Sequence, residues 1–165
     1  MTTPDTFDPI KVDDLYFAQH EEEQNQFYQQ LKTLPGSIAG VLFGMETAAV
    51  IEKISQEKKL NQKQSEEFSR LIRKILTAEV YLGNIVQELK NKLSVTEETA
   101  KELANDLISQ LFDESLEDIK KLHVEKFGRP AAEVATPSDS KSQIPEKDKP
   151  QIINPGNIVN LKNKN

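Results

Sequence analysis

Apolar residues recur at intervals of three and four along the middle of the chain, which is the spacing of one face of an α-helix. No proline occurs between Pro35 and Pro130, and proline is the residue that most strongly breaks a helix interior. The pattern therefore predicts an all-α fold for this region. Its clearest stripe consists of Phe68, Leu71, Ile72, Ile75 and Leu76.

Start and stop signals divide residues 21–128 into six helices. Asn61 with Gln64 three residues later forms a capping-box pattern, and Ser94 with Glu97 marks the start of a later helix. Gly128 is a typical residue just after a helix end. We therefore expect a compact bundle of about five to six short helices. They span roughly residues 21–33, 46–58, 61–76, 80–91, 94–112 and 113–127.

The two halves of the helical region resemble each other. The stripe at 68–76 matches a second stripe at 104–112, at a spacing of 36 residues. A Lys-Leu pair and a small polar residue precede the helix that carries each stripe. Two helical hairpins with approximate internal symmetry are therefore one arrangement to expect, although any two helices of similar period can be aligned in this way. A longer solenoid is excluded, because such stacks need three or more units.

Charge is distributed unevenly along the 165 residues, whose net charge is −6. Residues 1–26 carry seven acids and one base, residues 27–128 are nearly neutral, and residues 129–165 have a net charge of +2. The last segment also holds five of the eight prolines and no aromatic residue, so it lacks the apolar surface that offsets the entropy of ordering. We expect an acidic flexible arm at 1–20, a helical bundle at 21–128 and a disordered tail at 129–165.

Motifs for catalysis and cofactor binding are absent from the sequence. It has no cysteine, no glycine-rich phosphate loop, no paired-histidine zinc motif and no nucleophile elbow. His20 adjoins Glu21, Glu22 and Glu23, but consecutive side chains on a helix point in different directions and do not converge on one metal ion. His123 lies at an apolar helix position, which is typical of a packed histidine. We therefore expect no enzyme, no cofactor and no metal site.

Gly36, Gly40 and Gly44 recur at a spacing of four, as on the packing faces of membrane helices. The apolar run around them, residues 37–43, is far shorter than the roughly 20 residues that a spanning helix needs. We therefore expect no membrane span. We interpret the glycines as a tight turn and a closely packed helix start, with Gly44 capping the next helix. Residues 1–20 lack the pattern of a secretory signal, so we expect a cytoplasmic location.

The final fifteen residues, 151–165, contain the only cluster of large aliphatic side chains in the tail. Asn154-Pro155-Gly156 within them is a turn signal. A polar linker that ends in a short β-prone segment suits the addition of a strand to the sheet edge of a partner protein. A tail without a role, or one that folds back on its own body, is the alternative. The candidate partner-binding residues are Ile152, Ile153, Ile158, Val159 and Leu161.

The N-terminal segment FDPIKVDDLYF has a similar mixture of acidic and apolar residues. It is a candidate for a second docking peptide or for a clasp on the helical body.

Six basic residues form the alternative candidate site, a patch for phosphate contacts in nucleic acid. Glu66 and Glu67 interrupt this patch, and an i, i+4 pair such as Glu66 with Arg70 neutralises part of it. The nearly neutral charge of the body also argues against a dedicated nucleic-acid binder. The patch consists of Lys58, Lys59, Lys63, Arg70, Arg73 and Lys74.

A pattern of helices and caps extends over residues 42–123. It includes Leu42-Phe43-Gly44 before Glu46-Thr47, Ile51 to Ile54, Thr99 to Ala104, Leu111-Phe112 and Glu117 to Leu122. In this pattern the chain resembles uncharacterised small all-helical proteins of bacteria with reduced genomes. The resemblance implies an all-helical fold and a bacterial cytoplasmic setting, and it transfers no catalytic or binding residue.

Together these observations predict a protein–protein interaction module, an adaptor or assembly factor without catalytic activity. Weak nucleic-acid binding is the alternative function.

Overall fold

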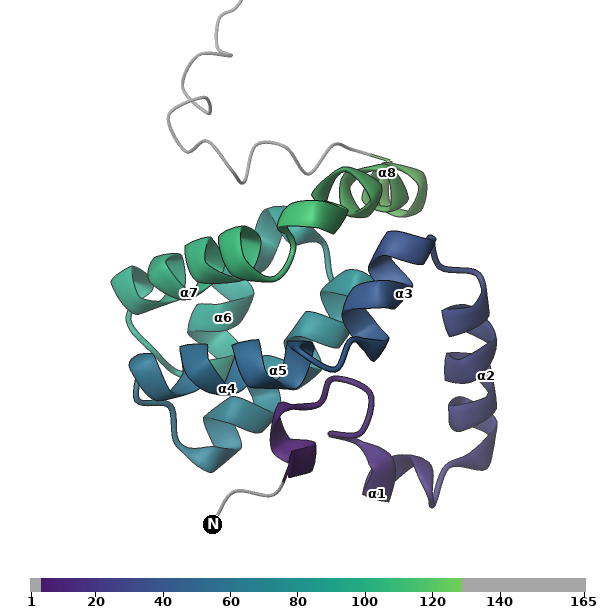
Figure 1. Cartoon of the computed structure of the whole chain (residues 1–165), viewed down its shortest axis with the longest axis horizontal. Helices are drawn as coiled ribbons and strands as arrows, with labels where there is room; N and C mark the ends of the chain where they lie inside the picture. The colour runs from purple at the N-terminus through teal and green to yellow at the C-terminus, as the bar shows by residue number, and fades with distance from the viewer. Residues whose placement is uncertain (1–3, 129–165) are drawn as a thin grey trace, which may run out of the picture. The chain divides into compact units, whose positions relative to one another are not determined.

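The computed structural model describes residues 4–128 of the chain. Within this range the backbone forms eight α-helices, three short 3₁₀ helices and no β-strand (Figure 1). The predicted all-α fold is therefore confirmed. The α-helices are α1 (Asp14–Phe17), α2 (Glu21–Lys32), α3 (Gly36–Phe43), α4 (Thr47–Glu57), α5 (Gln62–Leu76), α6 (Ile85–Leu93), α7 (Glu97–Gln110) and α8 (Leu116–Phe127). The 3₁₀ helices are η1 (Pro4–Phe7), η2 (Leu82–Asn84) and η3 (Asp113–Ser115).

The six predicted helices correspond to α2 and to α4 through α8. The two additional helices are α1, which lies in the predicted arm, and α3, which covers the apolar run before Gly44. Glycine lowers helix propensity by about 1 kcal/mol, which is why the sequence pattern favoured a turn there. Ile38 and Leu42, one helical turn apart, are both buried, and their burial outweighs that penalty.

Helix starts are predicted correctly for α5 but not for α7. Asn61 Oδ1 accepts a hydrogen bond from the backbone N–H of Gln64, and Gln64 Oε1 accepts one from the N–H of Asn61, both at 2.9 Å. The prediction that Ser94 starts the later helix is wrong. Ser94 ends α6 in a left-handed conformation (φ 55°), and Thr96 Oγ1 caps α7 by accepting from the N–H of Thr99. Serine and threonine both suit an N-cap. Ser94 already ends α6, so Thr96 is the residue that caps α7.

Helix α5 supplies the centre of the hydrophobic core. Phe68, Ile72, Ile75 and Leu76 of its predicted stripe are fully buried. Burial of a side chain of this size stabilises the fold by about 1.5–3 kcal/mol. The core is completed from the other helices by residues that are also fully buried, among them Ile38, Ile51, Ile54, Ile85, Leu89, Leu103, Leu107, Phe112 and Ile119.

The two predicted hairpins are not equivalent in the structure. α6 and α7, joined by residues 94–96, pack together far more extensively than α4 and α5 do. α5 packs instead against α6 and against the N-terminal η1. The similarity of the two apolar stripes therefore reflects a shared helical period and not a shared packing partner.

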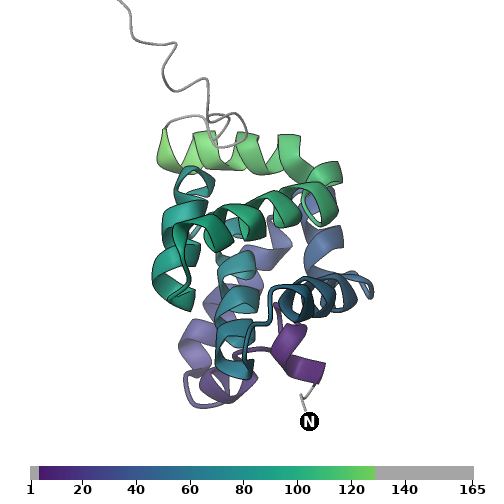
Figure 2. The same ribbon diagram turned by 90° about the vertical axis from the view of Figure 1, so that its left-hand side faces the viewer.

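Residues 4–20 are not the flexible arm that the charge distribution predicted. Phe7 and Phe17 are buried, and η1 contacts both α4 and α5. Ser69 Oγ on α5 donates a hydrogen bond to the carbonyl of Thr6 at 2.7 Å. Because aromatic side chains anchor it, this acidic segment overcomes the entropy of ordering. It has the form of a clasp on the helical body, and Figures 1 and 2 both place it at the end opposite α8.

By its contacts the chain divides into residues 1–131 and residues 132–165. The predicted disordered tail, 129–165, lies outside the described residues, and so do its candidate partner-binding residues.

Candidate functional site

A groove opens between the corner that joins α3 to α4 and the junction of α7 with η3. Its volume is about 790 Å³, which is within the usual range of binding clefts. We call it the corner groove. One wall consists of Ser37, Gly40, Val41, Val50 and the corner residues 44–47, and the other consists of residues 109–111 with Asp113 and Glu114.

The corner is built around Gly44. A Cβ atom at this position would lie 2.7 Å from the carbonyl oxygen of Gly40 and 3.1 Å from Thr47 Oγ1. Only glycine allows that close approach. Thr47 Oγ1 donates a hydrogen bond to the carbonyl of Val41, which ties the start of α4 to the end of α3. The corner is therefore a fixed turn.

The end of α3 and the turn that follows it direct two large apolar side chains outward. Met45 is 96% exposed and Phe43 is 58% exposed. Met45 lies between the corner groove and a second, smaller hollow of about 270 Å³, which Phe43 and residues 8–11 of the N-terminal segment also line. Both side chains line this hollow, and exposed apolar side chains that lie together are typical of a contact surface.

The opposite wall is formed where α7 ends. The backbone N–H groups of Leu111 and Phe112 both bond to the carbonyl of Leu107 at 2.9 Å, which closes the helix. Phe112 is fully buried in the core, whereas Leu111 is partly exposed in the groove. Leu111 therefore contributes an apolar surface that faces the corner.

The charged residues that line the corner groove are all acidic. They are Glu46, Asp113 and Glu114, and each is exposed. The ion pairs that the structure forms among residues 4–128 include none of the three. Lys53 reaches one edge, where its Nζ donates to the side-chain oxygen of Gln110 at 3.2 Å. The groove thus combines apolar side chains with a negative rim.

The interpretation of the glycines as a closely packed turn is wrong for Gly36 and Gly40. Both lie on α3, and a Cβ atom added to either would meet nothing within 4 Å. The backbone of α3 is therefore uncovered along this face, and Gly40 opens directly onto the corner groove. The spacing of the glycines pointed to this segment, but it did not show that the glycine face of α3 would stay uncovered.

The six basic residues of the nucleic-acid candidate do not form one open patch. Lys58 Nζ lies 2.8 Å from Glu102 and 3.4 Å from Asp106. Lys59 and Lys63 are exposed, and Lys74 is half-buried. Arg70 and Arg73 form ion pairs with Asp13 in the N-terminal segment.

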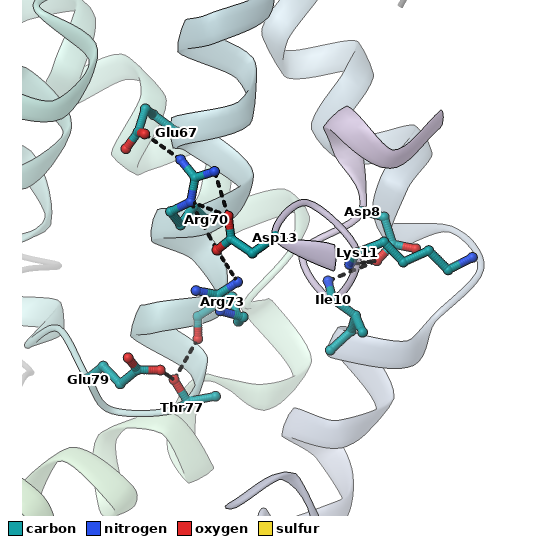
Figure 3. A network of polar contacts seen from close by, with 9 residues as sticks. All are labelled: Asp8, Ile10, Lys11, Asp13, Glu67, Arg70, Arg73, Thr77 and Glu79. Atoms are coloured by element: carbon teal, nitrogen blue, oxygen red, sulfur yellow. Dashed lines mark hydrogen bonds and ion pairs between the residues drawn. The ribbon is translucent and has the colours of Figure 1, made fainter. Parts of the chain in front are cut away.

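Asp13 holds both arginines (Figure 3). Arg70 Nη2 lies 2.6 Å from Asp13 Oδ1, and Arg73 Nη1 lies 2.7 Å from Asp13 Oδ2. Burial raises the pKa of Asp13, but the hydrogen bonds and charges of the two arginines outweigh that effect and lower it below 3.8. The Arg73 side chain is 5% exposed and lies against the rings of Phe17 and Phe27, whose centres are 5.8 and 5.3 Å from its Cζ.

A third hollow, of about 630 Å³, lies beside the network of Asp13, Arg70 and Arg73. The charged residues that line it are four acids and four bases, so it has no net preference for a charged ligand. The network has the geometry of a structural clamp for the N-terminal segment.

His123 is a packed histidine, as its apolar helix position predicts. Its Nδ1 accepts a hydrogen bond from the N–H of Leu82 at 3.0 Å, and its Nε2 donates to the carbonyl of Ile75 at 2.8 Å. The first bond requires a lone pair on Nδ1, so the ring is neutral. Burial lowers the pKa of His123 below 6.5, against the smaller effect of the Ile75 carbonyl. His123 thus connects α8 to η2 and α5.

Comparison with known proteins finds no matching family model, no similar curated protein and no similar solved structure. The resemblance to helical proteins of reduced-genome bacteria therefore stays a prediction. Residues 4–128 contain no group of three or more acids or histidines placed to hold a metal ion. No helix in that range is long and apolar enough to cross a bilayer.

Proposed function

We propose that this protein is a protein–protein interaction module, an adaptor or assembly factor, which binds a segment of another protein at the corner groove. The exposure of Met45 beside the groove carries this proposal. Full burial of an exposed side chain of this size contributes about 1.5–3 kcal/mol. A partner that covers both residues gains up to this amount from Met45 and a smaller part of it from Phe43, which is 58% exposed. We propose that the protein has no catalytic activity.

The rigidity of the corner supports the same function. Gly44 and the bond from Thr47 to Val41 fix the turn before any partner arrives. Binding therefore costs little backbone conformational entropy at this site. Exposed apolar anchors on a fixed turn are the arrangement that concentrates binding energy in a few residues.

The tail is a second contact within this proposal. Its residues Ile152, Ile153, Ile158, Val159 and Leu161 suit strand addition to a sheet of the partner. On the resemblance given by residues 42–123, we propose a bacterial cytoplasmic setting for the complex.

Site-specific photocrosslinking tests the proposed function. The photoreactive amino acid p-benzoylphenylalanine replaces Phe43, and the full chain is irradiated in the cells that naturally produce it. The control places the same group at Tyr28 on α2, which is 42% exposed and lines neither the corner groove nor the smaller hollow that Phe43 and Met45 line. We expect a covalent adduct of discrete mass from position 43 and none from position 28. Absence of an adduct at 43, or equal adducts at both positions, would overturn the proposal.

Truncation to residues 1–128 separates the groove from the tail. If the truncated chain recovers less of the partner than the full chain does, the tail contact is supported. Equal recovery from the truncated and full chains removes the tail from the proposal and leaves the groove.

Nucleic-acid binding through Lys58–Lys74 is the weaker candidate, because ion pairs occupy Lys58, Arg70 and Arg73. A shift assay with duplex and single-stranded probes at about 50 and 200 mM salt tests it. Binding at the lower salt that is lost at the higher would favour it, and no binding at the lower salt would end it.

A further inference from the structure

The charge of the corner groove restricts what it accepts. Glu46, Asp113 and Glu114 form its rim, and the residues that line it include no lysine or arginine. Beyond this rim, Asp118 accepts a hydrogen bond from Ser37 Oγ at the α3 wall. A segment that carries basic residues beside its apolar ones complements this surface, whereas an acidic segment is repelled.

The backbone around the groove favours a helix as the occupant. Residues 4–128 contain no strand, so an extended partner has no sheet edge to join at this site. The missing side chain of Gly40 leaves α3 open along one wall. A glycine on an uncovered helix face allows the backbone of a second helix to approach closely. Val41, Val50 and Leu111 then provide apolar surface for residues one turn apart on that helix.

From these observations we infer that the corner groove binds a basic amphipathic helix of a partner protein. The inference rests on the proposed function and identifies the chemistry of the partner. An anionic membrane does not fit the same surface, because the groove that Met45 lines also carries three acidic residues and no basic one.

Synthetic peptides provide the test. The first is a labelled helical peptide of about four turns, with leucine on one face and lysine on the other. The second replaces every lysine by glutamate, and the third is a scrambled form of the first that has the same composition. Binding to the full chain is measured by fluorescence anisotropy. We expect the basic amphipathic peptide to bind at least about tenfold more tightly than either of the others.

Two variants locate the binding in the groove. Gly40→Leu fills the open wall with a side chain that meets no atom of the protein at its Cβ, so it should block the peptide and leave the fold intact. Ala49→Leu is the matched control, since Ala49 is exposed on α4 and does not line the groove. We expect affinity to fall about tenfold or more in Gly40→Leu and to stay unchanged in Ala49→Leu, with circular dichroism confirming that both fold.

A charge-neutralising variant tests the acidic rim separately. Glu46→Gln, Asp113→Asn and Glu114→Gln together should weaken the basic peptide about tenfold, because each exposed charge pair contributes modestly. The control neutralises the exposed Glu21, Glu22 and Glu98, which changes the net charge equally at sites away from the groove.

Three results would overturn the inference: no binding of the basic peptide, equal binding of its acidic form, or equal effects of the two sets of neutralising changes. Binding of the protein to vesicles of phosphatidylcholine and phosphatidylglycerol that depends on Met45 would also overturn it, in favour of a lipid surface. A crosslinked partner at position 43 without any preference for the basic peptide would leave the proposed function standing and remove only this inference.

Discussion

Asp13→Asn is expected to lower the free energy of unfolding by about 3 kcal/mol. The change keeps the shape of the side chain and removes the charge that two arginines share. Loss of one partner from a fully buried pair costs about 3–5 kcal/mol, whereas an exposed pair contributes about 0–1 kcal/mol. The side chain of Arg73 is 5% exposed and that of Arg70 is 25% exposed, so the expected cost lies toward the buried case.

Urea unfolding followed by circular dichroism measures this loss in the full chain. Asp14→Asn is the control, because Asp14 is the neighbouring exposed carboxylate and takes part in no ion pair among residues 4–128. We expect the control to change stability by less than about 0.5 kcal/mol. A loss below about 0.5 kcal/mol for Asp13→Asn would refute the view that this carboxylate clamps the N-terminal segment.

A second substitution distinguishes the ion pair from simple packing. In the Asp13→Asn background, Arg73→Met replaces a stranded cation with an apolar side chain that lies against the rings of Phe17 and Phe27. We expect it to recover at least about 1 kcal/mol there and to destabilise the unmodified protein. If Arg73→Met has the same effect in both backgrounds, Asp13 and Arg73 do not interact energetically.

Three further predictions concern stability. Lys59→Gly should stabilise the fold by about 0.5–1 kcal/mol in urea unfolding, because Lys59 is exposed and has a left-handed φ of 57° after α4. Gly40→Ala should add a similar amount, because the new Cβ has open space in a helix. The wild type should lose stability as the pH falls through about 6.5, where the unfolded state binds a proton that buried, neutral His123 does not; His123→Gln should remove this dependence.

Each of these has an outcome that contradicts it. If the Lys59→Gly variant is less stable than the wild type, the contacts of the Lys59 side chain outweigh the strain of its left-handed backbone. A destabilised Gly40→Ala would show that something covers the face of α3 in the free protein. Identical pH profiles for the wild type and His123→Gln, measured down to the onset of carboxylate protonation, would show that His123 titrates normally in the folded state.

The sequence predicted most of the fold because helical periodicity and capping are local properties. The stripe around Phe68 identified the core face of α5, and Asn61 with Gln64 located its start. The wrong start at Ser94 has the same origin, since Ser94 and Thr96 are both cap-forming residues and are locally equivalent. Which of them begins α7 depends on how α6 ends.

The packing of the N-terminal segment was not predictable from composition. Its charge suggested a solvated arm, but its fold depends on Phe17 and on the pairing of Asp13 with arginines 57 and 60 residues away. The same distant pairing removes Arg70 and Arg73 from the basic patch. Long-range contacts of this kind leave no local pattern in a single sequence.

The corner groove was only partly visible in the sequence. The glycine spacing and the apolar run before Gly44 mark one wall of the groove, and the turn that they predicted there is helix α3. The second wall comes from residues 109–114, which are distant in the sequence and carry no motif. The exposure of Met45 likewise follows from the close approach of Gly44 to Gly40, which only the folded chain reveals.

The central claim, that a partner docks in the corner groove, is tested most directly by amide chemical shifts of the ¹⁵N-labelled full chain during titration with the basic amphipathic peptide. The account predicts saturable shifts concentrated at residues 37–47 and 109–114, and an affinity at least about tenfold lower in the Gly40→Leu variant. Shifts centred on Lys59 and Lys63, or an unchanged spectrum at saturating peptide, would contradict it.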